Sequence, residues 1–262
     1  MIPARDIRSR ARELGVPETT IERDYAQNWL LGHLASMNMV LKGGTGIRKV
    51  YIENYRFSDD LDFTLLEKMD SVALNDLVGS AVLGAKETSG INFIEEISIE
   101  ENINGFVVNV YFRILRSAGN PIKIKLDLTA PEKEEVLLPP EKRKIIHPYS
   151  DDFHVRIQAY SLEEIVAEKI RALFERTRPR DLYDVWRLHN EIDNGKVLNI
   201  LYKKCIIKDV EIDVRSLEDR RGDFANAWTN SLRHQIKALP DFDDVFYEVK
   251  QRIAGLLWMG DV

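Results

Sequence analysis

The sequence has 262 residues, of which 44% are hydrophobic and 31% are charged, and its formal net charge is −6 at pH 7. This composition is typical of a globular protein and excludes the disordered and fibrous classes. A chain of this length forms one large domain or two small ones, and its modest negative charge still allows a local basic patch.

Three features of the sequence indicate a cytoplasmic protein. No apolar run approaches the length of a membrane span, and the N-terminus lacks the apolar core of a signal peptide. The single cysteine, Cys205, allows no internal disulfide. We therefore expect a location in the cytoplasm, with no membrane contact.

The first third of the chain alternates between helices and strands. Helices are predicted over 6–14, ended by Gly15, and over 18–37, with Pro17 in the first turn. A strand over 38–42 leads into a glycine turn and a further helix over 45–52. The next segment, 57–65, alternates as a strand does, which places Asp60 and Asp62 on one face.

The middle of the chain is richer in strands. A helix over 70–87 precedes three predicted strands, over 91–99, 106–115 and 122–130. In the third of them, Lys123, Lys125, Asp127 and Thr129 face away from the apolar side chains. A connector rich in proline and charge leads to one more short strand over 153–160.

The remainder of the chain is helical in pattern. Ser161 and Glu164 form a capping box at the start of a helix that Pro179 is expected to stop, and mostly helical sequence follows to Val262. We therefore expect an α+β fold with a small mixed sheet flanked by helices. The expected domains are N-terminal helices packed on the core (1–36), an α/β core (37–160) and a helical C-terminal domain (161–262).

The acidic pair in the predicted strand 57–65 has two explanations. Strand residues two apart lie roughly 6.5 Å apart, so two ionised carboxylates repel by about 3 kcal/mol at an effective dielectric near 20. Either solvent relieves that repulsion, or a shared divalent cation does. Asp127 has the same apolar neighbours as Asp62, and an adjacent strand would bring it to the same cluster. Any one of these acids, taken alone, is more often simply solvated.

A glycine turn lies just before the acidic pair. Gly43, Gly44 and Thr45 join a predicted strand to a helix, an arrangement whose backbone N–H groups favour phosphate. A lone Gly-Gly is more often a plain turn. The turn, the acidic pair and the third acid together indicate nucleotide chemistry.

These motifs resemble those of the AbiEii/AbiGii toxin-like nucleotidyltransferases, which include the Men-type toxins and belong to the DNA polymerase β-like superfamily. The resemblance rests on KGGT at 42–45, RFSDDLD at 56–62, YSLEEIVAEKIRAL from Tyr160, RDLYD at 180–184 and IERDY at 21–25. It spans about residues 20 to 190. The combination of motifs is specific, although each one alone is not.

The resemblance implies roles for individual residues. It implies nucleotide binding by Lys42, Gly43, Gly44, Thr45 and Ser58; metal binding by Asp60, Asp62 and Asp127; and catalytic roles for Asp60, Asp62, Lys169 and Asp181. The metal would be Mg²⁺, with Mn²⁺ as the alternative. The division of roles among Lys169, Asp181 and Asp184 stays open, and a structural salt bridge from Lys169 to the next helix is the competing explanation.

The function expected on this basis is Mg²⁺-dependent transfer of NMP from an NTP to an acceptor, in a toxin–antitoxin or abortive-infection system. The acceptor would be the tRNA 3′ end or a protein hydroxyl, and a cognate antitoxin would be the protein partner. Basic residues that could hold RNA are Arg171, Arg176, Arg178, Arg180, Lys142, Arg143 and Lys144. The alternatives are a nucleotide-binding module that acts through a partner and a metal-dependent phosphohydrolase. The histidines and Cys205 are assigned to structure.

Overall fold

The structure is a computed structural model that describes residues 1–258. The chain forms two compact units: residues 1–160, here called the sheet unit, and residues from Ser161 onward, here called the helical unit. The helical pattern expected in the sequence runs to residue 262, so its last four residues lie outside the described part of the chain.

The sheet unit contains helices, strands and a short π-helix. Its elements are α1 (Ala4–Leu14), α2 (Glu18–Leu34), β1 (Met39–Lys42), α3 (Gly43–Gly46), the π-helix η1 (Ile47–Tyr51), β2 (Asp60–Leu65), α4 (Ser71–Ser89), β3 (Asn92–Asn102), β4 (Gly105–Arg113), β5 (Ile122–Thr129), β6 (Glu141–Lys144) and β7 (Arg156–Ala159).

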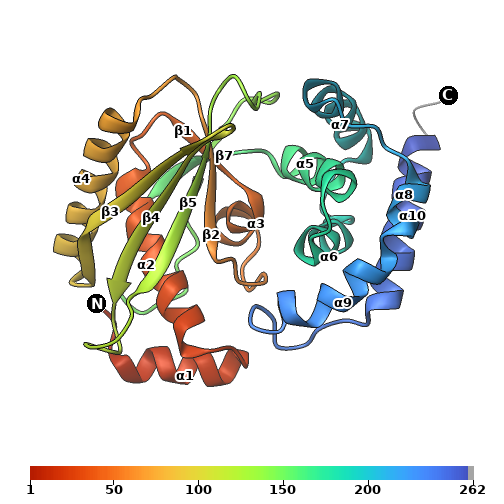
Figure 1. Cartoon of the computed structure of the whole chain (residues 1–262). Helices are drawn as coiled ribbons and strands as arrows, with labels where there is room; N and C mark the ends of the chain where they lie inside the picture. The colour runs from red at the N-terminus through yellow and green to blue at the C-terminus, as the bar shows by residue number, and fades with distance from the viewer. Residues whose placement is uncertain (259–262) are drawn as a thin grey trace. The chain divides into compact units, whose positions relative to one another are not determined.

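Across the described residues, seven strands form one mixed sheet in the order β3-β4-β5-β2-β1-β7-β6 (Figure 1). The pairs β2–β5 and β1–β7 are parallel, and the other neighbours are antiparallel. The α+β class expected from the sequence is confirmed.

Alternation along β2 and β5 separates an apolar face from a polar one. Leu61 and Phe63 of β2 and Leu126 of β5 are fully buried, whereas Asp62 and Asp127 are half-buried. The buried side chains join a core with residues of α2 and α4, which pack against each other. Each such apolar side chain contributes about 1.5–3 kcal/mol when fully buried. The acids therefore lie on the face opposite the core.

Gly15 ends α1 as expected from the sequence, and Asp70 caps α4 although the sequence analysis placed it inside that helix. Gly15 ends α1 in the left-handed conformation, with φ of 63°, and its N–H group bonds the carbonyls of Ala11 and Arg12. Asp70 caps α4 by accepting a hydrogen bond from the N–H of Ala73, at 2.8 Å. These contacts satisfy backbone groups that a helix end leaves unpaired.

Three local predictions for the sheet unit need correction. The strand expected over 57–65 begins only at Asp60, because the amide of Gln27 bonds the carbonyls of Ser58 and Asp59. The helix expected over 45–52 begins at Gly43, and its second half is the π-helix η1. The connector contains the strand β6, which pairs with β7.

The helical unit is built from helices as far as residue 258. They are α5 (Leu162–Glu175), α6 (Pro179–Leu188), α7 (Asn194–Lys208), α8 (Val214–Asp219), α9 (Arg221–Leu232) and α10 (Phe242–Trp258). Ser161 caps α5, accepting from the N–H of Glu164 at 3.1 Å. The prediction that Pro179 stops α5 is wrong, because α5 ends at Glu175 and Pro179 occupies the first turn of α6, where its missing N–H costs nothing.

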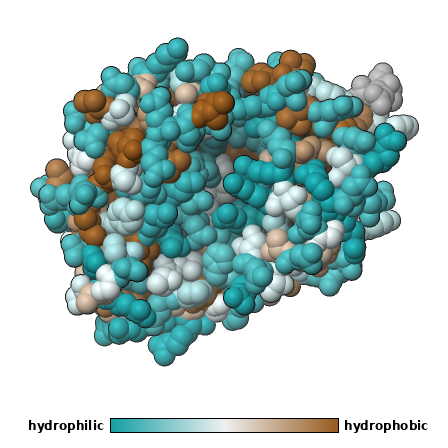
Figure 2. Space-filling view, in the orientation of Figure 1, coloured by the Kyte–Doolittle hydropathy of each residue, from teal (hydrophilic) through white to brown (hydrophobic). Residues whose placement is uncertain are grey.

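The surface is largely polar. Figure 2 shows hydrophilic side chains over most of the face in view and hydrophobic ones in separate patches. Exposed apolar residues such as Val72 on α4 and Ile206 on α7 are of the kind that folded proteins commonly leave on the surface. Among residues 1–258, no helix has both the length and the apolar character needed to cross a bilayer.

Candidate functional site

The strand register aligns three of the predicted site residues in one row. Lys42 of β1 lies opposite Asp62 of β2, and Asp62 lies beside Asp127 of β5. Directly aligned residues on neighbouring strands share a face, and neighbouring strands lie about 4.8 Å apart. Asp60, two residues before Asp62, shares that face and lies beside Lys125. The sheet therefore brings Lys42 and the acids Asp60, Asp62 and Asp127 together.

Asp127 also has a basic neighbour, Lys125, on its own strand. Lys125 Nζ lies 2.8 Å from Asp127 Oδ2, and the two side chains are 33% and 32% exposed. Among the described residues, no group of three or more histidine, cysteine or acidic side chains is placed to hold a metal ion. The neighbouring carboxylates of Asp60 and Asp62 nevertheless fit Mg²⁺ chemically, since Mg²⁺ takes one or two carboxylates and completes its shell with water and phosphate.

The two glycines allow other groups to approach the backbone closely. Gly43 has φ of +68°, and a Cβ atom there would overlap the carboxylate of Asp62. A Cβ atom on Gly44 would lie 2.6 Å from Arg56 Nη2 and 3.3 Å from Ser58 Oγ. The glycine turn thus brings Asp62 and Ser58, both predicted site residues, against the same stretch of backbone.

Thr45 has a different environment from the one its predicted role suggests. Its side chain is fully buried, and its hydroxyl donates a hydrogen bond to the carbonyl of Asp60. This contact fixes the start of β2 relative to the glycine turn. Nucleotide binding by the Thr45 hydroxyl stays a prediction.

Lys42 is buried beside an aromatic ring. Only 8% of the residue is exposed, and its Nζ lies 5.6 Å from the centroid of the Tyr160 ring. The Tyr160 hydroxyl in turn lies 2.8 Å from Thr64 Oγ1. The ring face attracts the ammonium, which is thereby held on the same face of the sheet as the acids.

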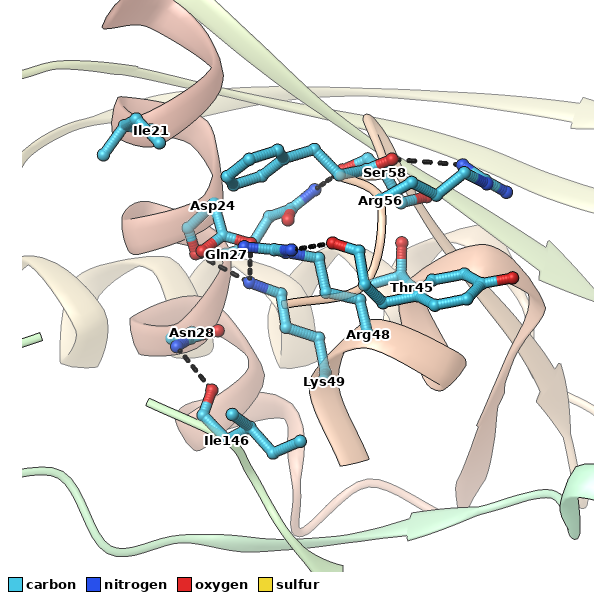
Figure 3. Close-up of polar contacts among 12 residues, drawn as sticks. Ile21, Asp24, Gln27, Asn28, Thr45, Arg48, Lys49, Arg56, Ser58 and Ile146 are labelled. Atoms are coloured by element: carbon cyan, nitrogen blue, oxygen red, sulfur yellow. Dashed lines mark hydrogen bonds and ion pairs between the residues drawn. The ribbon is translucent and has the colours of Figure 1, made fainter. Parts of the chain in front are cut away.

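Helix α2 holds the segment that carries Ser58 and leads to Asp60. Gln27 Nε2 donates to the carbonyl of Ser58 at 3.1 Å (Figure 3). It also donates to the carbonyl of Asp59 at 3.0 Å. Arg23 adds an ion pair with Asp59, whose Nη1–Oδ1 distance is 2.5 Å. The backbone from Ser58 to Asp60 is therefore positioned from outside the sheet.

A buried carboxylate in the same helix holds the segment after the glycine turn. Asp24 Oδ1 lies 2.6 Å from Arg48 Nε and 2.8 Å from Lys49 Nζ, and the three residues are at most 6% exposed (Figure 3). Tyr149 donates its hydroxyl to Asp24 Oδ2 at 2.6 Å. Burial alone would raise the pKa of Asp24, but the charges of Arg48 and Lys49 outweigh burial and hold that pKa well below its usual value.

The pKa of Lys49 is also lowered, but here burial outweighs the charge of its partner. Burial lowers the pKa of its ammonium to about 8, although Asp24 acts to raise it. No role was predicted from the sequence for Asp24, Arg48, Lys49 or Lys125. For Asp24 a signal was available, because it lies three residues after Ile21 on the apolar side of α2, where a charged residue is expected to be buried and paired.

The helical unit contains a second cluster of predicted residues. Lys169 Nζ lies 2.5 Å from Asp181 Oδ1 and 3.1 Å from Asp184 Oδ2, and Arg176 Nε lies 3.1 Å from Asp181 Oδ2. Burial acts to raise the pKa of Asp181, but Lys169 and Arg176 together lower it to about 2. The salt bridge expected as the structural explanation is therefore present. The catalytic roles of Lys169 and Asp181 stay predictions.

The basic residues considered for RNA binding differ in exposure. Arg171 is 7% exposed and pairs with Glu175 at 3.2 Å, so it is not part of a surface patch. Arg143 lies over the ring of Tyr51, 4.2 Å from its centroid. Lys142 and Lys144 of β6 are exposed and lie on one side of that strand.

Cys205 and His147 have the structural environments expected for them. Burial raises the pKa of the Cys205 thiol to about 11, so this thiol is protonated at neutral pH. His147 Nε2 lies 2.9 Å from Asp151 Oδ1. These contacts indicate packing rather than nucleophilic chemistry.

Comparisons with known proteins place the chain in a family and find solved structures with a similar fold. The model of the AbiEii nucleotidyltransferase toxins of type IV toxin–antitoxin systems matches residues 29–248. MenT4, a nucleotidyltransferase toxin from Mycobacterium tuberculosis H37Rv, is 19% identical with a TM-score of 0.69, over 98% of this chain and 90% of that one. JHP933 from Helicobacter pylori is 20% identical with a TM-score of 0.54, over 92% and 93%. At such identities these two structures show the fold alone. A search of curated protein sequences gives no significant match.

Proposed function

This chain belongs to the AbiEii family of nucleotidyltransferase toxins of type IV toxin–antitoxin systems, and we propose that it transfers NMP from a Mg²⁺-bound NTP to the 3′ end of tRNA. The family implies an NTP substrate and an antitoxin partner. The observation that carries the proposal is the row formed by Lys42, Asp62 and Asp127 beside the glycine turn. We place the reaction in the cytoplasm, where NTP and tRNA are present.

Different residues of the sheet unit would have different roles in the reaction. Asp60 and Asp62 would hold the metal, which offsets phosphate charge when bound. The backbone N–H groups of the turn at Gly43 and Gly44 would bind the triphosphate. The hydroxyl of Ser58, which lies against Gly44, would donate to a phosphate oxygen. The acceptor hydroxyl attacks the α-phosphorus in line and pyrophosphate leaves, a reaction that depends mainly on positioning and charge.

An RNA acceptor is supported by basic residues on the acid-bearing face of the sheet. Leu41 lies beside Ala159, so Gln158 of β7 shares the face of Lys42, and Arg156 does so as well. Lys142 lies opposite Gln158 and Lys144 opposite Arg156, which puts both lysines on that face. The sheet order separates β6 from β2 by three strand spacings, roughly 14 Å. Such cations suit the phosphates of an acceptor strand.

The test is transfer of label from each of the four α-³²P-labelled NTPs, with Mg²⁺, into total tRNA. Label on RNA that disappears in Asp60→Ala would support both the acceptor and the metal role of Asp60. Label that persists in Asp60→Ala would contradict the metal assignment. If wild type binds NTP but labels no RNA, the acceptor is a protein hydroxyl, or the chain is a nucleotide-binding module that acts through its partner.

A further inference from the structure

The acid-bearing face of the sheet continues from β5 onto its neighbour β4, where it carries an aromatic ring (Figure 1). Tyr111 of β4 lies opposite Lys123 of β5, and Asn109 lies opposite Lys125. The residue between Tyr111 and Asn109, Val110, is fully buried in the core on the other face. Tyr111 therefore shares the face of the acids, two strand spacings or roughly 10 Å from β2.

Tyr111 and Lys123 lie across the acids from the glycine turn. Lys125 lies beside Asp60, and Lys123 is two residues nearer the start of β5. Because β2 and β5 are parallel, Lys123 is level with the residues that lead into β2. The glycine turn follows β1, which is the neighbour of β2 on its other side. The acids of β2 thus separate the turn from Lys123 and Tyr111.

This arrangement matches the geometry of an in-line displacement, in which the incoming oxygen and the leaving pyrophosphate lie on opposite sides of the α-phosphorus. The proposed function assigns the triphosphate to the glycine turn, on the β1 side of the acids. The acceptor oxygen then approaches from the opposite side, that of β5 and β4. Lys142 and Lys144 lie beyond β1 and β7, so they suit phosphates farther along the acceptor.

Tyr111 and Lys123 together have the chemistry of a site for single-stranded nucleic acid. Tyr111 is half-buried, Lys123 is exposed, and neither side chain forms a hydrogen bond or ion pair with another residue in 1–258. Arg113 adds a second positive charge on the same face, two residues after Tyr111. Aromatic rings on which bases stack, flanked by cations for the phosphates, are the features with which proteins bind single strands.

We propose that the 3′-terminal nucleotide of the RNA acceptor binds here, with its base stacked on the Tyr111 ring and a phosphate at Lys123. This inference rests on the proposed function, because that proposal makes RNA the acceptor. It adds the side of the acids from which the RNA end enters and the residues that hold that end. Both residues would contact substrate directly.

The experiment measures binding of a fluorescein-labelled single-stranded RNA to the full chain by fluorescence anisotropy. The RNA has about eight nucleotides and the 3′-terminal sequence of tRNA. Tyr111→Leu keeps apolar bulk on the sheet and removes the ring, so it should weaken binding about five- to a hundredfold, the range for one stacked base. Tyr111→Phe keeps the ring and should stay within about twofold of wild type. Tyr247→Ala, which removes an exposed ring from α10, is the control and should leave binding unchanged.

Lys123→Met tests the phosphate contact. It should reduce the slope of log affinity against log salt concentration by about 0.7, the value for one phosphate of a single strand. Its matched control is Lys133→Met, which removes an exposed charge beyond the other end of β5 and should leave the slope unchanged.

An RNA that lacks only its 3′-terminal base tests which base is stacked. The difference in affinity between wild type and Tyr111→Leu should disappear with this RNA. A difference that persists, or a Tyr111→Leu variant that binds the intact RNA as tightly as wild type, overturns the inference. In either case transfer of label to tRNA would leave the proposed function standing. If folded wild type binds no RNA and labels a protein instead, the RNA acceptor and the inference both fail.

Discussion

Asp24 is a buried side chain that supports the candidate site through its two ion pairs. Its carboxylate joins Arg48 and Lys49, which belong to η1, to helix α2. η1 directly follows the glycine turn of α3, so this contact fixes the turn as well. Removing one partner of a buried ion pair costs far more than the pair contributes, because the remaining charges stay buried without compensation.

Asp24→Asn is therefore expected to lower the free energy of unfolding by about 3–5 kcal/mol at pH 7. The pKa of Asp24 in the folded state lies below its ordinary value of 3.8, so its contribution is fully present above pH 4 and is lost as the pH falls further. The difference between wild type and variant should thus narrow below pH 4. Urea unfolding of wild type and Asp24→Asn at several pH values measures this difference in the free energy of unfolding.

The control for that comparison is Asp76→Asn, which removes an exposed carboxylate from α4. It should change stability by less than about 0.5 kcal/mol. A cost for Asp24→Asn as small as that of the control would contradict the buried ion pair. A difference that widens on acidification would contradict the depressed pKa.

Among the secondary-structure elements, helix α2 positions Ser58 and Asp59, the two residues that lead into β2. Gln27 donates to two successive carbonyls, those of Ser58 and Asp59, and is itself fully buried. Because these carbonyls are bonded to a side chain, the backbone here follows α2 instead of a strand ladder. The orientation of Ser58 and Asp60 therefore depends on a helix that carries no proposed catalytic residue.

Gln27→Ala should lower the kcat for nucleotide transfer by about ten- to a hundredfold, because small displacements of reacting groups are costly. Gln27→Glu should fail to restore it, since a carboxylate cannot donate to the two carbonyls. Steady-state kinetics measure kcat, and far-UV circular dichroism shows that the variants are folded. Gln251→Ala, at an exposed position, is the control. Wild-type kcat in folded Gln27→Ala would show that the contact does not position the site.

The elements also show how far the sequence predicts this structure. The alternation of β2 and β5 was sufficient to separate the acids from the apolar side chains within each strand, because side-chain direction follows from strand period. That Asp127 shares a face with Asp60 and Asp62 depends also on the pairing of the two strands. The strand β6 was missed because its residues, Glu-Lys-Arg-Lys, have no apolar alternation and pair only through β7. The contacts of Gln27 and Lys125 depend on packing and register, which local pattern does not specify.

At the scale of the whole molecule, the family match spans both units, from residue 29 to 248. The sheet unit carries the acids and the glycine turn, and the helical unit carries the paired Lys169 and Asp181. The test of nucleotidyltransferase activity therefore uses the full chain. A transferase and a phosphohydrolase with the same acids differ in the inorganic product that they release.

The most direct test is to quantify pyrophosphate and orthophosphate released by the full chain with Mg²⁺, NTP and tRNA, alongside the nucleotide incorporated. We expect one pyrophosphate per nucleotide transferred, loss of both products in Asp62→Asn, and near wild-type amounts in Glu100→Gln. Glu100 is the matched control because it is exposed and lies in the same row of the sheet, two strands from Asp127. Release of orthophosphate, or an Asp62→Asn variant as active as wild type, would contradict nucleotidyl transfer at this site.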